Sequence, residues 1–384
     1  MATSMAAASQ TSAVGQMIRV RFATNRNQTG DDELFGSDFR NAPDGSLFVT
    51  GSIDVYDRGG SPHPNWVPDP KSLRLDPTPT AALSSIPQAV AAGRSTSDAM
   101  IAFIEDRLQA EAEKGKSLGN SGIVFLPGFN TTFISAMSCS AQIVSAYGAS
   151  GVFCFSWPSQ GEFGLSPYLT DQNSAYESGN AIALSLSVVF SKLLNIVKSK
   201  RPNLHIVCHS MGNRALGAAI QNISISAPEL LSENYFEYAL LMAADEDYDA
   251  LDEPKKLKPL LTLATNIDVY TNENDAAMFL SGIINLHPPL GSFGPANFGK
   301  LPSKAIWIDC TDVGSTYEND GSSDFGHQYF RLSEPVTADV HQVLLGTAPD
   351  KVVPRNPDPQ FPKRKFVIPY STSSAWARSR GYTS

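Results

Sequence analysis

Short apolar segments alternate with helix-compatible stretches along most of the chain. The apolar segments have no polar face, which is the pattern of strands that are buried on both sides of a sheet. In the stretches between them, apolar residues recur every three or four positions, as on one face of a helix. This alternation predicts the α/β class, with a doubly wound, mostly parallel sheet and helices on both of its faces. We expect core strands at 122–128, 151–157, 204–210, 238–244, 267–272 and 305–310.

Two segments near the N-terminus follow a different pattern. Residues 17–24 and 48–57 alternate apolar and polar side chains, which predicts strands of the edge type. The segment 58–80 is rich in Pro, Gly and Asp, and it predicts a loop. Helices are expected within 95–114, from about 173 to 200, at 211–223 and at about 335–346.

The two ends of the chain lie outside this pattern. Residues 1–16 contain neither the basic stretch nor the leucine-rich stretch of a secretory signal, and we expect a disordered leader there. Residues 347–384 hold seven Lys or Arg and two Asp, which makes them a basic C-terminal tail. Nothing divides the chain between these ends. We therefore predict a single domain over 17–346 that begins with an N-terminal strand extension.

Composition and charge exclude several classes of protein. The formal net charge is −9, and because the tail carries +5, the rest of the chain carries −14. Such an acidic body does not suit a nucleic-acid partner. No apolar run approaches the ~18 to 20 residues that span a bilayer. The four cysteines are widely spaced without a C-x-x-C pair, which argues against a disulfide framework or a zinc site. We expect a cytoplasmic protein with no membrane span, no metal and no cofactor.

A serine stands where one apolar strand turns abruptly into a helix, in the run Cys208-His209-Ser210-Met211-Gly212. This is the position of the G-x-S-x-G nucleophile elbow, in which a strained turn lifts the hydroxyl above the sheet. Small residues on either side let the strand and the helix approach closely. Gly212 is one of them, and Cys208 replaces the other glycine. The pattern predicts Ser210 as a nucleophile, and a helix N-cap is the alternative.

An acyl-transfer site also needs two backbone N–H groups directed at the developing oxyanion. Met211, the residue after the nucleophile, is expected to supply one of them. Phe129 is expected to supply the other, because Gly128 lets the loop after the predicted strand 122–128 turn inward. Pro127 stands in that loop where a histidine is expected. Proline has no side-chain hydrogen bond to offer, so another group must brace the loop.

A hydroxyl nucleophile needs a base, and in this architecture the chain order is serine, acid, histidine. Asp275 lies just beyond the strand that ends near residue 272, and we predict it as the acid. His327 lies between the last strand and the last helix, where the base is expected. The alternatives are Asp245, Asp247 and Asp249 for the acid and His287 for the base.

Six short motifs together resemble one known family. They are RFATNRN, VFLPGFNTTF, FSWPSQG, HSMGN, YTNENDAA and GHQYF, and the resemblance covers roughly residues 18 to 345. The family is the α/β-hydrolase group catalogued as domain of unknown function 900. The resemblance implies the α/β-hydrolase fold and a serine hydrolase with Ser210 as nucleophile, Asp275 as acid and His327 as base. The chain departs from the family at Pro127, in place of a histidine, and at Cys208, in place of a smaller alanine.

Four residues are expected to line the substrate pocket. Trp157 lies at the end of the predicted strand 151–157 and is expected to shape the pocket floor or wall. The segment 276–303 is apolar, rich in Gly and Pro, and follows the acid directly, which predicts a lid or a wall on the acyl side. Within it, Phe279 and His287 are the expected pocket residues, and Pro127 of the oxyanion loop completes the set.

These features favour a metal-independent serine hydrolase of the esterase or lipase type that cleaves small-molecule carboxylic esters. The same machinery also serves amide, lactone or thioester hydrolysis and acyl transfer, which differ in pocket shape and water access. A different class of function is the alternative: a non-catalytic α/β-hydrolase fold that binds a ligand or a protein.

Overall fold

The computed structural model describes residues 15–41, 45–60, 63–77, 85–92, 99–114, 120–162, 164–254, 256–313 and 326–369. The predicted leader lies outside these ranges apart from residues 15 and 16, and so do residues 370–384 of the predicted tail. Within the described ranges, no helix has both the length and the apolar character needed to cross a membrane.

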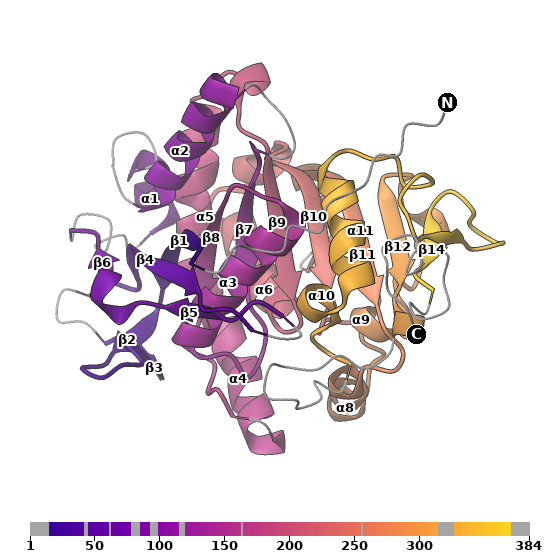
Figure 1. Ribbon diagram of the computed structural model, residues 1–384, viewed down its shortest axis with the longest axis horizontal. Coiled ribbons are helices and arrows are strands. Elements are labelled where there is room, and N and C mark those ends of the chain that lie inside the picture. The colour runs from indigo at the N-terminus through magenta and orange to yellow at the C-terminus, as the bar shows by residue number, and fades with distance from the viewer. Residues whose placement is uncertain are drawn as a thin grey trace.

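One sheet of twelve strands dominates the described residues, and its middle is parallel (Figure 1). Every neighbouring pair from β1 to β12 runs parallel, in the order β1-β8-β7-β9-β10-β11-β12. All six predicted core strands are present, and the predicted α/β class is confirmed. Across the sheet the strands are β13 (Asn356–Pro357), β14 (Lys365–Val367), β12 (Ala305–Asp309), β11 (Ala264–Thr271), β10 (Phe236–Met242), β9 (Leu204–His209), β7 (Gly122–Leu126), β8 (Gly151–Ser156), β1 (Met17–Thr24), β4 (Val49–Asp57) and β5 (Trp66–Pro68), with β6 (Arg74–Leu75) also paired to β4.

The N-terminal strands are not edge strands, so that prediction is wrong. β1 pairs with β8 on one side and β4 on the other, and β4 also pairs with β5 and β6 from the predicted loop. The alternation has another cause: two polar positions of β1 are Arg19 and Arg21, which form ion pairs with Asp54 and Asp106. A separate hairpin, β2 (Arg26–Gln28) and β3 (Phe35–Phe39), follows β1 directly.

Helices cover both faces of the sheet, as Figure 1 shows. α3 (Phe133–Tyr147) and α11 (Glu334–Leu344) lie on one face, and α2 (Ala99–Lys114), α5 (Gly179–Leu194) and α6 (Gly212–Ser226) lie on the other. The other helices are α1 (Ile86–Ala92), α4 (Leu165–Glu177), α7 (Leu260–Leu263), α8 (Ala276–Asn285), α9 (Leu290–Phe293) and α10 (Tyr329–Leu332), with short 3₁₀ turns η1 (Pro70–Ser72), η3 (Lys198–Lys200), η4 (Pro228–Ser232), η5 (Phe298–Lys300) and η6 (Thr311–Val313).

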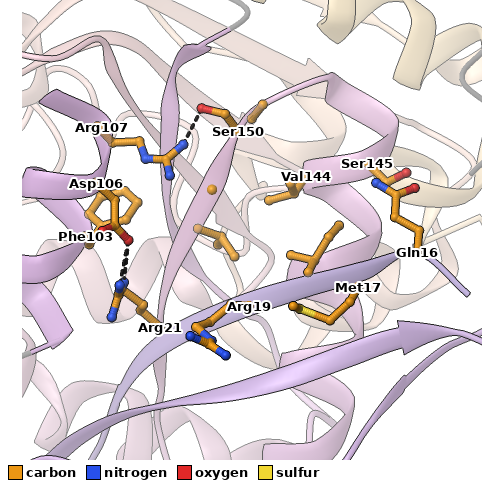
Figure 2. A pocket seen from close by; sticks show the side chains of 14 residues that line it. Gln16, Met17, Arg19, Arg21, Phe103, Asp106, Arg107, Val144, Ser145 and Ser150 are labelled. Carbon is orange, nitrogen blue, oxygen red and sulfur yellow. Dashed lines mark hydrogen bonds and ion pairs between the residues drawn. The ribbon is translucent and has the colours of Figure 1, made fainter. Parts of the chain in front are cut away.

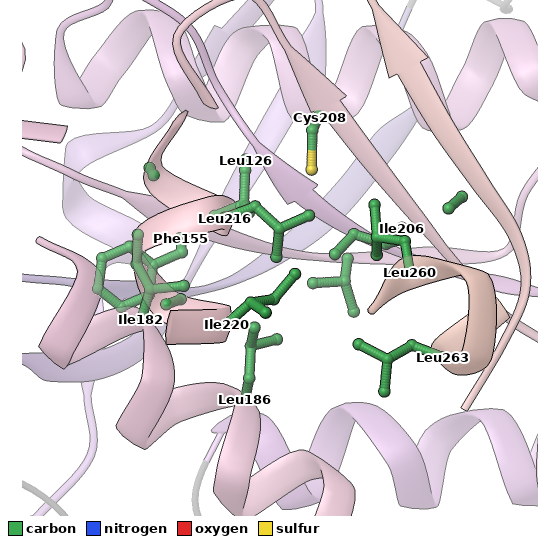
Figure 3. Close-up of a cluster of buried hydrophobic side chains, with 14 of the residues drawn as sticks. Leu126, Phe155, Ile182, Leu186, Ile206, Cys208, Leu216, Ile220, Leu260 and Leu263 are labelled. Carbon is green, nitrogen blue, oxygen red and sulfur yellow. The ribbon is translucent and has the colours of Figure 1, made fainter. Parts of the chain in front are cut away.

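Each face of the sheet has its own apolar core. In the larger core, Leu186 of α5 and Leu216 of α6 pack with Ile206 of β9 (Figure 3). In the other core, Met137 of α3 and Val340 of α11 are buried together. Strands that are apolar on both sides are needed because both faces are covered.

The single helix predicted from about 173 to 200 is two helices, and that prediction is corrected. α4 ends at Glu177, and α5 begins at Gly179. A β-carbon at Gly179 would lie 2.6 Å from the Cβ of Ala218, so glycine is what allows α5 to pack this closely on α6. The break leaves α4 at the end of the molecule where α8 also lies (Figure 1).

Part of the predicted basic tail belongs to the folded domain. β14 extends the sheet in parallel beside β12. The side chain of Arg355 is buried, and its Nε and Nη2 donate to the two carboxylate oxygens of Asp339 at 2.6 and 2.9 Å. Its Nη2 also lies 3.5 Å from Oδ2 of Asp268 in β11. The domain therefore extends beyond residue 346, the limit that the sequence indicated.

We expect the substitution Arg355→Met to destabilise the fold by about 3–5 kcal/mol, because it leaves two buried carboxylates, Asp339 and Asp268, without their cation. Urea denaturation at neutral pH measures the change in the free energy of unfolding. The matched control is Lys351→Met, which removes an exposed pair with Asp350 and is expected to cost less than about 1 kcal/mol. Equal losses in both variants would contradict a stabilising role for Arg355.

Candidate active site

Ser210 occupies a strained turn between β9 and α6. Its φ is +52°, in the left-handed region that L residues with side chains rarely adopt. The N–H of Ser210 donates to the carbonyl of Met242 at 2.9 Å, and its own carbonyl accepts from the N–H of Asp245 at 3.1 Å. These bonds hold the turn at the carboxyl ends of β9 and β10. A helix N-cap has an extended backbone and a side-chain bond to the first turn, and α6 has neither at Ser210.

Two glycines let neighbouring segments close tightly around the serine. A β-carbon at Gly212 would lie 2.3 Å from the carbonyl oxygen of Leu126, and one at Gly128 would lie 2.7 Å from Cβ of Ser210. The first contact brings the start of α6 against the end of β7. The second brings the loop of residues 127–131, the predicted oxyanion loop, against the serine. Cys208 is fully buried in the core, where its compact side chain fits.

The predicted acid and base lie in direct contact. Nδ1 of His327 lies 2.7 Å from Oδ2 of Asp275, and both side chains are buried. The other carboxylate oxygen of Asp275 accepts from the N–H groups of Ala277 and Met278 at 3.0 and 3.1 Å. Asp275 is therefore also the N-cap of α8, and one carboxylate both starts this helix and orients the imidazole.

The loop that carries His327 is held against the serine turn by His209. Nε2 of His209 donates to the carbonyl of His327 at 3.2 Å, and the two rings lie 4.6 Å apart. Phe330 stacks on the other side of the His209 ring at 4.1 Å. Burial lowers the pKa of His209 well below its ordinary value, so this ring is neutral at pH 7. Sequence reasoning did not assign it this role.

A second brace comes from Asn272 at the end of β11. Its Nδ2 donates to the carbonyl of Gly326 at 3.2 Å, directly before His327. Gly326 has a φ of +78°, so the chain turns sharply at that point. Together Asn272 and His209 fix the backbone on both sides of the His327 imidazole.

The oxyanion loop is braced by side chains in the way that Pro127 made necessary. The indole Nε1 of Trp157 donates to the carbonyl of Pro127 at 2.8 Å. Asn130, at a φ of +55°, donates its N–H to Oδ2 of Asp171 at 3.4 Å. The N–H of Thr131 donates to the hydroxyl of Ser159 at 3.0 Å. The loop that contains Phe129 is therefore bonded at Pro127, Asn130 and Thr131.

Arg26 is the central cation of this brace, and the sequence analysis missed it. Its side chain is 1% exposed and donates to the carbonyls of Thr131 and Ser159, with the latter at 3.0 Å. It also donates to the carbonyl of Gly36 at 2.9 Å and to the hydroxyl of Ser156 at 3.0 Å. Burial lowers the pKa of Arg26 to about 10, so the group is charged at pH 7. Its place as the second arginine of the RFATNRN motif was the available sequence signal for this role.

The alternative acids have other partners. Asp245 is fully buried and accepts from Tyr168 Oη at 2.8 Å, from Ser281 Oγ at 2.7 Å and from Arg214 Nη2 at 3.2 Å. This cluster links α4, α6 and α8 beside the serine turn. Asp247 and Asp249 both form ion pairs with Lys256. In the described part of the chain, no group of three or more His, Cys, Asp or Glu is arranged to hold a metal ion.

The four predicted pocket residues lie in different surroundings. Pro127 lines a cavity of about 420 Å³, together with His209 and Phe330. Trp157 is buried beneath the oxyanion loop. Phe279 is 69% exposed on α8, and His287 is exposed just beyond that helix. The predicted lid or wall, 276–303, contains α8, α9 and η5.

A separate cavity of about 330 Å³ lies at the other end of the sheet, where β1 and β8 begin (Figure 2). All three of its arginines have partners: Arg19 pairs with Asp54, Arg21 pairs with Asp106, and Arg107 donates to the hydroxyl of Ser150. None of the predicted site residues lines this cavity. Ser210, Asp275 and His327 all follow the opposite, carboxyl ends of the strands, which is where open α/β sheets bind their ligands.

Comparison with known proteins identifies the family. A family model described as "Alpha/beta hydrolase of unknown function (DUF900)" matches residues 104–347, a range that includes Ser210, Asp275 and His327. The comparison with curated proteins gives no match.

Proposed function

The chain belongs to the α/β-hydrolase family of unknown function (DUF900), and from this premise we propose that it is a serine hydrolase that cleaves carboxylic esters. The observation that carries the proposal is the 2.7 Å contact between Asp275 and His327. The carbonyl of this histidine is bonded to His209, the residue that directly precedes a serine held at a φ of +52°. A strained, buried serine turn at the end of a parallel sheet is typical of a nucleophile.

In the proposed mechanism, His327 takes the proton of the Ser210 hydroxyl as the oxygen attacks the ester carbonyl. Nδ1 of His327 is bonded to Asp275, which leaves Nε2 for the serine. The Asp275 carboxylate holds the ring and stabilises the imidazolium. The alkoxide leaves with the proton from His327, and an acyl-enzyme remains on Ser210. Water then attacks the acyl carbon and gives a proton to His327. The carboxylic acid leaves as His327 returns this proton to the Ser210 oxygen.

The negative charge on the carbonyl oxygen is expected to be met by the backbone N–H groups of Met211 and Phe129. Met211 lies at the amino end of α6, where a helix leaves N–H groups without internal acceptors and carries partial positive charge. Phe129 lies in the loop that Arg26 and Trp157 brace. The proposal needs this loop to be rigid, because an oxyanion hole stabilises the transition state only when its donors are already in place.

Covalent labelling tests this proposal directly. A fluorophosphonate probe is expected to label the native protein at one site, and mass spectrometry should locate the label on Ser210. Heat-denatured protein and Ser210→Ala are the controls, and neither should react. If Ser210→Ala reacts as well as the native protein, or if native protein does not react at all, the non-catalytic binding function would be favoured instead.

The substitution Arg26→Lys is expected to lower kcat for a p-nitrophenyl ester by roughly 10- to 100-fold, with a smaller change in KM. Lysine keeps the charge, but one ammonium group cannot reach the four acceptors that the guanidinium holds. The oxyanion loop should therefore lose its position while the triad stays intact. Steady-state kinetics measures both constants.

The matched control is Arg19→Lys, on the neighbouring β1 strand, where the side chain is exposed and pairs with Asp54. It should leave both constants unchanged. Urea denaturation separates loss of folded protein from loss of rate. A rise in KM at constant kcat in Arg26→Lys would mean that Arg26 affects binding of the substrate and does not position the oxyanion loop.

A further inference from the structure

Two helices beside the serine turn present their apolar side chains to solvent. On α8, Phe279, Ile283 and Leu286 follow one another at helical spacing, and Leu286 just after the helix is 86% exposed. On α4, Leu165, Leu169 and Tyr176 form a similar exposed stripe. We call these six residues the α4–α8 face. An ordinary surface helix directs its apolar stripe toward the core, and here the direction is reversed.

The reversal is built into the fold, because the polar side chains of the same helices face inward. Nε2 of Gln172 in α4 donates to Oδ1 of Asn285 in α8 at 2.7 Å, and Nδ2 of Asn285 donates to Oη of Tyr168 at 3.0 Å. Tyr168 and Ser281 both donate to the buried carboxylate of Asp245. Hydrogen bonds of Asn285 thus link the two helices, and both lie at the end of the molecule that Figure 1 shows below the sheet.

The two helices contribute almost no charge to the α4–α8 face. The segment 276–294 contains no Asp, Glu, Lys or Arg, and in 165–177 the only exposed charge is Glu177, because Asp171 is buried. At the edge of the face, Tyr176 lines a cavity with Arg214, Glu246, Asp247 and Lys256. Phe279 and Tyr176 are aromatic, as protein interfaces favour, but neither helix supplies an arginine anchor, and a second copy of the chain is the competing occupant. An anionic membrane or a nucleic acid needs clustered cations. The surface that an uncharged apolar face complements is an uncharged lipid–water interface.

The same face adjoins the candidate active site. α8 begins at its N-cap Asp275, and Tyr168 of α4 packs edge-to-face against Phe129 of the oxyanion loop with ring centroids 5.6 Å apart. A lipid surface that contacts the α4–α8 face therefore lies next to the serine turn. We infer that this face docks on an uncharged lipid–water interface and presents the site to water-insoluble esters. The choice of substrate class rests on the proposed function, whereas the docking does not.

Vesicle binding tests the docking without using catalysis. The full chain carrying Ser210→Ala is mixed with phosphatidylcholine vesicles, and the bound fraction is measured by flotation. Adding Ile283→Ser and Leu286→Ser should weaken the partition coefficient by roughly tenfold or more, because two apolar side chains no longer enter the interface. The matched control carries Val197→Ser and Ile225→Ser, which are similarly exposed aliphatic residues on other elements. It should bind as the parent does. Circular dichroism checks that all three proteins are folded.

Several outcomes would overturn the docking. One is the absence of vesicle binding by the parent, and another is equal loss in the test and control variants. A third is a concentration-dependent dimer in gel filtration that only Ile283→Ser and Leu286→Ser dissociate, since a second copy would then cover the face. Failure of the proposed function is distinguishable, because it would abolish fluorophosphonate labelling and leave vesicle binding intact.

Catalysis by the native protein then tests the substrate class. The Ile283→Ser, Leu286→Ser protein should lose at least about tenfold of its rate on an emulsified triglyceride and keep its rate on a water-soluble p-nitrophenyl acetate solution. An equal loss on both substrates would contradict the assignment to water-insoluble esters.

Discussion

Ser210→Ala is expected to lower kcat for p-nitrophenyl butyrate by about 10³-fold or more. Alanine removes the only atom of the side chain that can form the acyl-enzyme, so His327 and Asp275 have no nucleophile to activate. A residual rate above that of buffer is expected, because the N–H groups of Met211 and Phe129 can still stabilise a carbonyl attacked directly by water. Initial rates at saturating substrate measure kcat.

The fold should survive this substitution. Ser210 is held by backbone bonds to Met242 and Asp245, which alanine retains, and alanine meets the same strain at a φ of +52°. Circular dichroism and urea denaturation verify this. The matched control is Ser224→Ala, because Ser224 is an exposed serine near the end of α6, the helix that follows Ser210. This variant should have full activity. Equal rates for wild type and Ser210→Ala would remove the serine from the mechanism.

Asp275→Asn is expected to lower kcat by about 10³- to 10⁴-fold while the protein stays folded. Asparagine would present its amide NH₂ to Nδ1 of His327, and that favours the tautomer with the proton on Nε2. This tautomer cannot accept the proton of Ser210. The amide oxygen of asparagine can still accept from the N–H groups of Ala277 and Met278, so the N-cap of α8 is preserved. Steady-state kinetics measures the loss.

Asp275→Ala separates the two functions of this carboxylate. Its kcat should be reduced about as much as that of Asp275→Asn. Its free energy of unfolding should also be lower by about 1 kcal/mol, because the N-cap of α8 is lost. Urea denaturation of both variants gives the difference. If Asp275→Asn kept its rate to within tenfold and Asp275→Ala lost only stability, Asp275 would be a helix cap and His327 would need another acid.

Much of the fold could be predicted because its signals are local. A strand buried on both faces must be apolar throughout, so the six core strands are visible in the sequence, and the α/β class follows from their alternation with helices. The serine turn is also visible in the sequence, because an apolar strand, a serine between small residues and a helix follow one another directly. The tight contact of Gly212 with Leu126 of β7, by contrast, is not local. The order of Ser210, Asp275 and His327 follows from which loops leave the carboxyl ends of parallel strands.

The errors arose where a local pattern has two causes. Alternation in β1 indicated an edge strand. β1 is instead paired on both sides, and its arginines form ion pairs with Asp54 of β4 and Asp106 of α2. The periodicity after residue 173 runs across the break between α4 and α5, and the close approach of Gly179 to Ala218 on α6 is not visible in that pattern.

By itself the sequence determined the α/β class, the core strands and the chain positions of the candidate serine, acid and histidine, because these depend on neighbours a few residues away. The tertiary structure decided that Arg26 braces a loop more than 100 residues later, that His209 holds the carbonyl of His327, and that α4 and α8 expose their apolar sides. Such contacts join residues that chain proximity does not relate. They depend on how packed elements bring distant side chains together, and no local pattern of apolar and polar residues encodes that placement.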